Sequence, residues 1–128
     1  MIVVDTSALL AILFDEPEAA GCKRVLEAET DVHISGGTLA EVLVILAHRG
    51  GVEEMIALVE DLGIMVDPVT ATAAERVGLA HGRWGRGAHA AKLNFGDCFA
   101  YALADERNCP LLYIGDDFSK TDVMSALA

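Results

Sequence analysis

A chain of 128 residues has room for one domain, and we expect a single compact unit over residues 1–128. Hydrophobic residues make up 53% of the sequence, which excludes an intrinsically disordered protein. The formal net charge is −11, from 20 acidic and 9 basic residues, and this excludes a protein that holds nucleic acid by bulk positive charge. Any contact with nucleic acid must therefore be local or assisted by another protein.

The sequence predicts a cytoplasmic protein that does not associate with membranes. No apolar run approaches the ~20 residues that cross a bilayer, and the amino terminus, MIVVD, lacks the basic segment of a signal peptide. The cysteines are odd in number and lack metal-binding spacing, so we expect reduced thiols in the core at Cys22, Cys98 and Cys109.

Strands and helices alternate along the predicted chain. Strands are expected at 2–4, 32–35, 64–68 and 111–114, and helices at about 8–14, 17–29, 38–49, 52–62, 70–81 and 95–106. Each strand is short and mostly apolar, which is typical of a parallel sheet covered by helices on both faces. Ligands of such α/β sheets gather at the carboxyl ends of the strands.

Three stretches carry expectations of their own. Thr38 precedes Glu41 by three residues, so we expect a capping box that opens the third helix. The segment 82–94 holds three glycines and no clear apolar period, which predicts mostly loop. The stretch 76–92 contains no acid and is the basic strip of the chain, with Arg76, Arg83, Arg86, Lys92, His81, His89 and Trp84.

Three acids stand in apolar surroundings. Asp5 follows the first predicted strand, Glu41 is the one charged residue in 38–47, and Asp97 is the one charged residue in 93–104. Acids that are buried together must be protonated, paired or bound to a metal, because burial and mutual repulsion both oppose their charged forms. Such isolated carboxylates therefore predict a shared site.

Each of these acids also has a purely structural interpretation. Asp5, with Thr6 and Ser7, supplies the residue types that cap a helix. Glu41 would serve the capping box, and Asp97 would stabilise the first turn of its helix or form a hidden salt bridge.

Oxygen ligands without His or Cys favour Mg²⁺, with Mn²⁺ as a substitute, and these ions characteristically engage phosphates. An ion of this kind activates water for phosphodiester hydrolysis. A fourth acid is expected from the Gly-Asp-Asp turn after the last strand. Asp116 is preferred because it lies nearer the strand than Asp117, the alternate, although a simple turn explains both residues.

Four segments together resemble the PIN-domain ribonuclease toxins of the VapBC toxin–antitoxin type: IVVDTSALLAILFDEPE, the helix start TLAE, LNFGDCFAYALA and LLYIGDDFSKTDV. They span nearly the whole chain. The resemblance implies a three-layer α/β/α sandwich with a mostly parallel sheet and an acidic pocket for Mg²⁺ or Mn²⁺. It places the catalytic, metal-binding acids of the family at Asp5, Glu41 and Asp97, with Asp116 or Asp117 as the fourth.

The same resemblance implies the toxin of a type II toxin–antitoxin system, acting as an endoribonuclease on tRNA or other structured RNA. Thr6, Ser7 and Asn94 match polar positions that assist the metal or the substrate. The implied partners are a cognate antitoxin, a second copy of the chain in a homodimer, and operator DNA through the antitoxin alone.

The basic strip offers the RNA backbone a few phosphate contacts, through Arg83, Arg86 and Lys92.

Three alternatives compete with a nuclease. A haloacid-type phosphatase uses a second aspartate two residues after the first, where this chain has Ser7. A phospho-acceptor receiver domain needs an aspartate at the end of a central strand, and the strand VHIS ends without one. A catalytically silent PIN-fold module that binds or regulates other molecules is the third alternative, and the sequence leaves it open.

Overall fold

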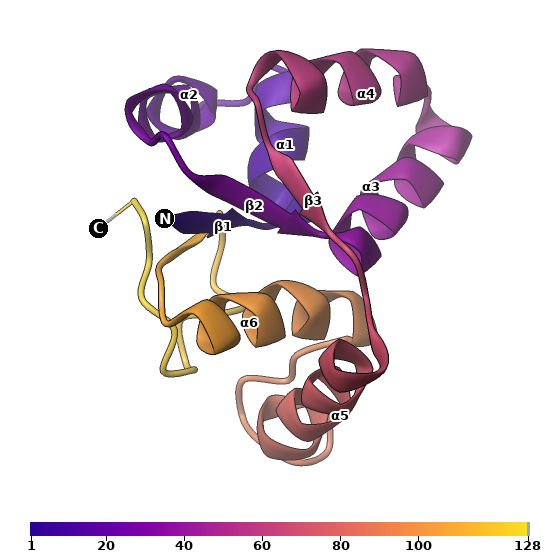
Figure 1. Cartoon of the computed structure of the whole chain (residues 1–128), viewed down its shortest axis with the longest axis vertical. Coiled ribbons are helices and arrows are strands. Elements are labelled where there is room, and N and C mark those ends of the chain that lie inside the picture. Colours follow the sequence, from indigo (N-terminus) through magenta and orange to yellow (C-terminus); the bar gives the residue numbers. More distant parts are fainter. Residues whose placement is uncertain (128) are drawn as a thin grey trace.

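The computed structural model describes residues 1–127, in which the backbone forms one α/β unit. Its elements in chain order are β1 (Ile2–Val4), α1 (Thr6–Leu13), α2 (Ala19–Ala28), β2 (Val32–Ser35), α3 (Gly36–Arg49), α4 (Val52–Asp61), β3 (Met65–Asp67), α5 (Ala71–Trp84), α6 (Phe95–Arg107) and β4 (Leu111–Leu112). The strands form a parallel sheet in the order β3-β2-β1-β4. Helices α1 to α4 lie on one side of it and α5 and α6 on the other, as the predicted three-layer fold requires (Figure 1).

Strands β1, β2 and β4 are buried on both faces, which explains their mostly apolar residues, whereas the edge strand β3 exposes Met65 and Val66. Side chains alternate between the faces along a strand. In β1, Ile2 and Val4 join the apolar cluster under α1 to α4, whereas Val3 joins the cluster under α5 and α6. The cysteines are free thiols in these interiors, as predicted.

Helix α3 begins earlier than the sequence predicted, so the expected capping box at Thr38 is wrong. Strand β2 leads directly into the helix, and its last residue, Ser35, is the N-cap: the Ser35 hydroxyl accepts the N–H of Gly37 at 3.1 Å. Gly36 and Gly37 therefore form the first helical turn instead of a break. Thr38 lies inside the helix, fully buried, and Glu41 is released from any capping role.

Helix α5 ends later than predicted, at Trp84, so residues 82–84 are helical where the sequence indicated loop. Trp84 is only 8% exposed, and burying its indole extends the helix by one turn. The indole packs in the apolar cluster on the α5 and α6 side of the sheet, which we call the lower layer. The rest of the segment is irregular, as predicted. Backbone hydrogen bonds hold it: the Leu93 N–H donates to the Trp84 carbonyl at 3.0 Å, and the Arg86 N–H donates to the Leu93 carbonyl at 3.1 Å.

Other boundaries move by a few residues. Helix α1 already begins at Thr6, and α2 begins at Ala19 instead of Pro17. Strand β4 covers only Leu111–Leu112, because the Ile114 N–H donates to the Ser7 hydroxyl instead of continuing the ladder. Along residues 1–127, no helix combines the length and the apolar character that a membrane crossing requires.

Candidate active site

Asp5 lies at the carboxyl end of the central strand β1 and is the N-cap of α1. One carboxylate oxygen, Oδ2, accepts the Ser7 N–H at 3.1 Å and the Ser7 hydroxyl at 2.8 Å. The other, Oδ1, is buried and has no hydrogen-bond partner among the described residues. The capping interpretation therefore holds for one oxygen, and the second oxygen is left to bind something else.

Ser7 couples this carboxylate to the neighbouring strand. Its hydroxyl donates to Asp5 and accepts the backbone N–H of Ile114 at 3.0 Å. Ile114 follows β4, which pairs with β1 in the sheet. The two strand ends, separated by more than one hundred residues in sequence, are thus joined through the side chain that orients Asp5.

Glu41 reaches the same place from α3, on the upper side of the sheet. Its Oε1 accepts the Thr6 hydroxyl at 2.7 Å, a contact between residues 35 positions apart. Thr6 is the first residue of α1 and directly follows Asp5. The contact brings Glu41 to the amino-terminal end of α1, beside Asp5.

Asp97 comes from the lower layer, at the start of α6. It forms a capping box with Asn94: the side-chain oxygen Oδ1 of Asn94 accepts the Asp97 N–H at 2.8 Å, and Asp97 Oδ2 accepts the Asn94 backbone N–H at 3.0 Å. First-turn stabilisation is therefore part of what Asp97 does. The residue is 8% exposed, and within residues 1–127 its Oδ1 makes no hydrogen bond.

The three carboxylates share one pattern: in each, one oxygen accepts hydrogen bonds and the other accepts none among the described residues. Burial raises the pKa of Asp5 to about 6 despite the Ser7 hydrogen bonds, and the charge of Glu41 adds to the increase. Burial likewise raises the pKa of Asp97 to about 6, against the Asn94 hydrogen bond, with further increases from the charges of Asp5, Asp117 and Glu41. The acids therefore interact electrostatically, as members of one cluster.

For the fourth acid, the structure and the sequence favour different residues. Asp117 is among the charges that raise the pKa of Asp97, and Asp116 is not. Both side chains are exposed in the turn after β4, where the Asp116 carbonyl accepts the Ser119 N–H at 3.1 Å and the Ser119 hydroxyl at 2.7 Å. The electrostatic effect on Asp97 thus favours Asp117, the alternate, over Asp116.

The donor set fits a hard divalent cation. It consists of carboxylate oxygens, and one of them, Asp5 Oδ1, is a buried anionic atom without a partner, which is costly unless a cation or proton balances it. Across the described residues, no three His, Cys, Asp or Glu side chains are already grouped as a complete metal cage. The carboxylates are oriented by Thr6, Ser7 and Asn94, but they do not yet converge on a single point.

The basic residues predicted to meet the substrate lie at the end of α5 and in the following loop. The Arg83 guanidinium packs 4.5 Å from the centre of the Trp84 ring and lies 3.5 Å from the Asp122 carboxylate. Arg86 and Lys92 are exposed. All three belong to the lower layer, on the side of the sheet that carries Asp97.

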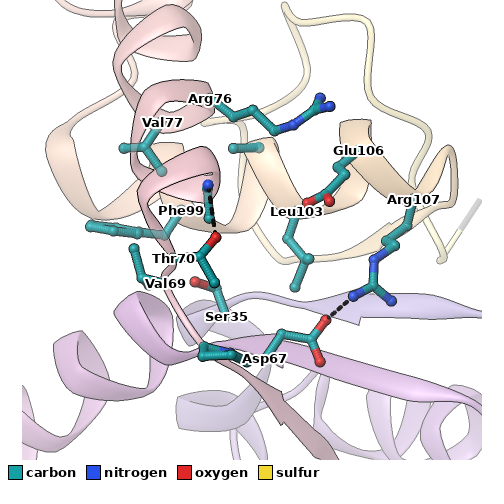
Figure 2. Close-up of a pocket in the computed structure, with 13 residues that line it drawn as sticks. Ser35, Asp67, Val69, Thr70, Arg76, Val77, Phe99, Leu103, Glu106 and Arg107 are labelled. Atoms are coloured by element: carbon teal, nitrogen blue, oxygen red, sulfur yellow. Dashed lines mark hydrogen bonds and ion pairs between the residues drawn. The ribbon is translucent and has the colours of Figure 1, made fainter.

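A cavity of about 210 Å³ opens elsewhere, between the end of β3 and helices α5 and α6 (Figure 2). Apolar side chains such as Phe99 and Leu103 line it, and an ion pair between Arg107 and Asp67, 2.6 Å long, lies at its edge. None of the predicted catalytic acids lines this cavity. Its lining has one carboxylate paired with Arg107 and a single further acid, Glu106, so it does not gather the several carboxylates that the predicted chemistry requires.

One residue of the site had no signal in the sequence. Gly96, in the first turn of α6, lies directly against the Glu41 carboxylate. The contact depends on how α3 and α6 cross, so local patterns in the chain do not reveal it.

The PIN domain family matches residues 2–124. Ribonuclease VapC28 of Mycobacterium tuberculosis is 42% identical over 130 residues, covering 98% of this chain and 97% of that protein. Among solved structures, VapC20 of Mycobacterium tuberculosis, described as a sarcin–ricin loop cleaving toxin, has a TM-score of 0.77 at 22% identity over 97% of each chain. VapBC2 of Rickettsia felis, bound to a promoter DNA fragment, has a TM-score of 0.72 at 14% identity, over 98% of this chain and 96% of that one. The chain therefore belongs to the PIN domain family and, within it, to the VapC ribonucleases.

Proposed function

We propose that this protein is the toxin of a type II toxin–antitoxin system and an endoribonuclease that hydrolyses RNA with Mg²⁺, for which Mn²⁺ can substitute. The observation that carries the proposal is the cluster of Asp5, Glu41 and Asp97, in which each carboxylate is oriented through one oxygen while Asp5 Oδ1 is buried without a partner. The full-length similarity to proteins named VapC ribonucleases supports RNA as the substrate.

The free oxygens of Asp5, Glu41 and Asp97, with Asp117 or Asp116, would hold the ion. Such an ion would supply a lowered pKa for the attacking water and compensation for negative charge on the phosphate. Residues of this protein orient the carboxylates. The hydroxyls of Ser7 and Thr6 orient two of the carboxylates by donating hydrogen bonds to them, and the Asn94 N–H orients the third.

The substrate proposal extends to structured RNA, including tRNA. Arg86 and Lys92 are exposed and offer charges for phosphates, while the Asp122 carboxylate and the Trp84 ring orient Arg83. With a net charge of −11, the chain as a whole does not attract RNA, so a few local contacts must supply the binding.

The proposed partners are a cognate antitoxin, a second copy of this chain, and operator DNA through the antitoxin. The Rickettsia felis VapBC2 structure, bound to promoter DNA, has the same fold and supports this assignment. The acidic surface complements a basic antitoxin segment, and the proposed setting of the complex is the cytoplasm.

The test is RNA cleavage by purified, antitoxin-free protein with total tRNA and ribosomal RNA, in Mg²⁺, in Mn²⁺ and in EDTA. We expect cleavage that EDTA abolishes, and Asp5→Asn or Asp97→Asn should reduce it by about 100-fold or more while the protein remains folded. The matched control is Asp15→Asn. Asp15 is exposed and has a φ of 51°, a conformation that asparagine also tolerates.

If the wild-type protein leaves both RNA pools intact with either ion, the enzyme proposal fails. The catalytically silent binding module would then become the better account of the fold.

A further inference from the structure

Helices α3 and α6 approach each other closely at two glycines, one on each helix. A Cβ atom at Gly37 of α3 would overlap the ring of Phe99 on α6, and a Cβ atom at Gly96 of α6 would overlap the carboxylate of Glu41 on α3. The order of the contacts, 37 with 99 and 41 with 96, shows that the helices run antiparallel where they meet. Each helix thus leaves space for one side chain of the other.

The glycine at position 96 is not required by the backbone. Gly96 lies in α6, and its φ is outside the left-handed region in which glycine is favoured. Alanine is a better helix former than glycine, so helix propensity opposes this residue. What remains as its physical role is the space that the missing side chain leaves.

That space is occupied by the acid proposed for the active site. An added Cβ would overlap Oε2 and Cδ of Glu41 and would lie 2.9 Å from Oε1. On its other side, Oε1 accepts the Thr6 hydroxyl at 2.7 Å. Thr6 and Gly96 therefore confine the Glu41 carboxylate from two directions, one by a hydrogen bond and the other by shape.

We infer that Gly96 is a positioning residue: by having no side chain, it lets the Glu41 carboxylate lie between α3 and α6, beside Asp5 and Asp97. This inference rests on the proposed function, because position matters only if Glu41 serves the metal site. A methyl group at residue 96 would displace the carboxylate while leaving every acid in the chain. The helix itself would tolerate the change, since the end of a flexible glutamate side chain can move.

The first experiment measures Mn²⁺ affinity by calorimetry and RNA cleavage for Gly96→Ala, Glu41→Gln and the double variant. We expect Gly96→Ala to weaken Mn²⁺ binding about tenfold and to lower cleavage, as loss of an orienting group around a metal does. In the Glu41→Gln background, Gly96→Ala should have little further effect, because the acid that it displaces is already absent. Equal losses from Gly96→Ala in both backgrounds would overturn the inference.

The second experiment reads the contact without metal or RNA. In the Glu41→Ala background the clash is absent, so Gly96→Ala should raise Tm by about 3 °C or more through helix propensity. In the wild-type background the displaced carboxylate should cancel that gain. Gly78→Ala is the matched control, because Gly78 lies within α5 and a Cβ there meets no atom within 4 Å.

These two readouts separate the inference from the proposed function. If Gly96→Ala alone fails to fold, Glu41→Ala should restore folding, and failure of that rescue would overturn the inference. If the wild-type protein neither binds Mn²⁺ nor cleaves RNA, the proposed function fails. Equal Tm changes in the two backgrounds would overturn the placement of Glu41 against Gly96, whatever the activity.

Discussion

The two oxygens of Asp5 lie in unlike environments, and the difference separates structure from chemistry within one side chain. Oδ2 caps α1 through Ser7, whereas Oδ1 is buried without a partner. The helix N-terminus favours the negative charge, but burial disfavours it more, and the net effect is a pKa of about 6. At neutral pH and without a cation, the negative charge of Asp5 is therefore destabilised by burial.

This buried charge predicts that the stability of the metal-free protein depends on pH. The Asp5 pKa rises from 3.8 to about 6 on folding, so the folded state binds the proton more tightly than the unfolded chain does. Its contribution to stability is present below pH 3.8 and is lost as the pH rises through about 6. In EDTA at pH 7.5, Asp5→Asn should raise the free energy of unfolding by about 1–3 kcal/mol.

Denaturant unfolding of both proteins at pH 4 and pH 7.5 checks this expectation. The advantage of Asp5→Asn should shrink at pH 4, where the wild-type acid is largely protonated. A variant that is destabilised equally at both pH values would show that Asp5 is a structural cap and carries no electrostatic strain.

The fourth acid gives a second prediction at the residue scale. Because the charge of Asp117 acts on Asp97, Asp117→Asn should lower Mg²⁺-dependent RNA cleavage by about tenfold, on the scale seen for residues around a metal. Asp116→Asn is its neighbouring control and should have a smaller effect, since the Asp116 contacts to Ser119 use the backbone carbonyl. Steady-state cleavage rates compare the two. A larger loss from Asp116→Asn would restore the assignment that the sequence favoured.

At the scale of elements, the residue at which α3 begins decides whether Glu41 caps its own helix or joins the carboxylate cluster. Because Ser35 caps the helix at the end of β2, the first turn begins at Gly36 and Glu41 faces Thr6 instead of its own backbone. Thr38, one turn before Glu41, is fully buried, and its hydroxyl has no hydrogen-bond partner in the described part of the chain. A shift of the cap by three residues thus converts a local capping acid into a member of the site.

The cap assignment is testable by stability. Ser35→Ala should lower the free energy of unfolding by about 1 kcal/mol, because the Gly37 N–H loses its acceptor. Thr38→Val keeps the shape and removes an unpaired buried hydroxyl, so it should be neutral or stabilising. Chemical denaturation of both variants is the measurement. Had Thr38 been the cap, the order of the two effects would be reversed.

At the scale of the whole molecule, an ionic network joins the sheet to the lower layer. The buried ring of His33, in β2, contacts Asp31 at 2.7 Å and Asp67, in β3, at 3.0 Å. Asp67 also binds Arg107, at the end of α6. Burial lowers the pKa of His33. The hydrogen bonds and charges of Asp67 and Asp31 together raise it by more, so the net change in pKa is upward.

A raised histidine pKa means that the folded state favours the protonated ring. The stabilisation is complete below the unfolded value of about 6.5 and is lost as the pH rises through the higher folded value. We therefore expect His33→Gln to lower Tm more at pH 6 than at pH 9, measured by thermal melts. His48→Gln is the control, because His48 is exposed at the end of α3. Equal losses at both pH values would mean that the ring is neutral in the folded protein.

Much of the fold follows from local patterns. The β2 strand and the alternation of strands and helices are readable because continuously apolar strands and periodic helices follow from burying a sheet on both faces. The boundaries that the sequence missed lie where tertiary contacts override local preference. Trp84 extends α5 to bury its indole, and Ile114 leaves β4 to reach Ser7.

The candidate site divides in the same way. Asp5, Glu41 and Asp97 could be singled out from the sequence because lone charges in apolar segments require compensation. Only the tertiary structure decided that Thr6 orients Glu41 and that Gly96 makes room for it. Those contacts join residues 35 or more positions apart, and their geometry is set by how α3 packs against α1 in its own layer and against α6 in the opposite layer.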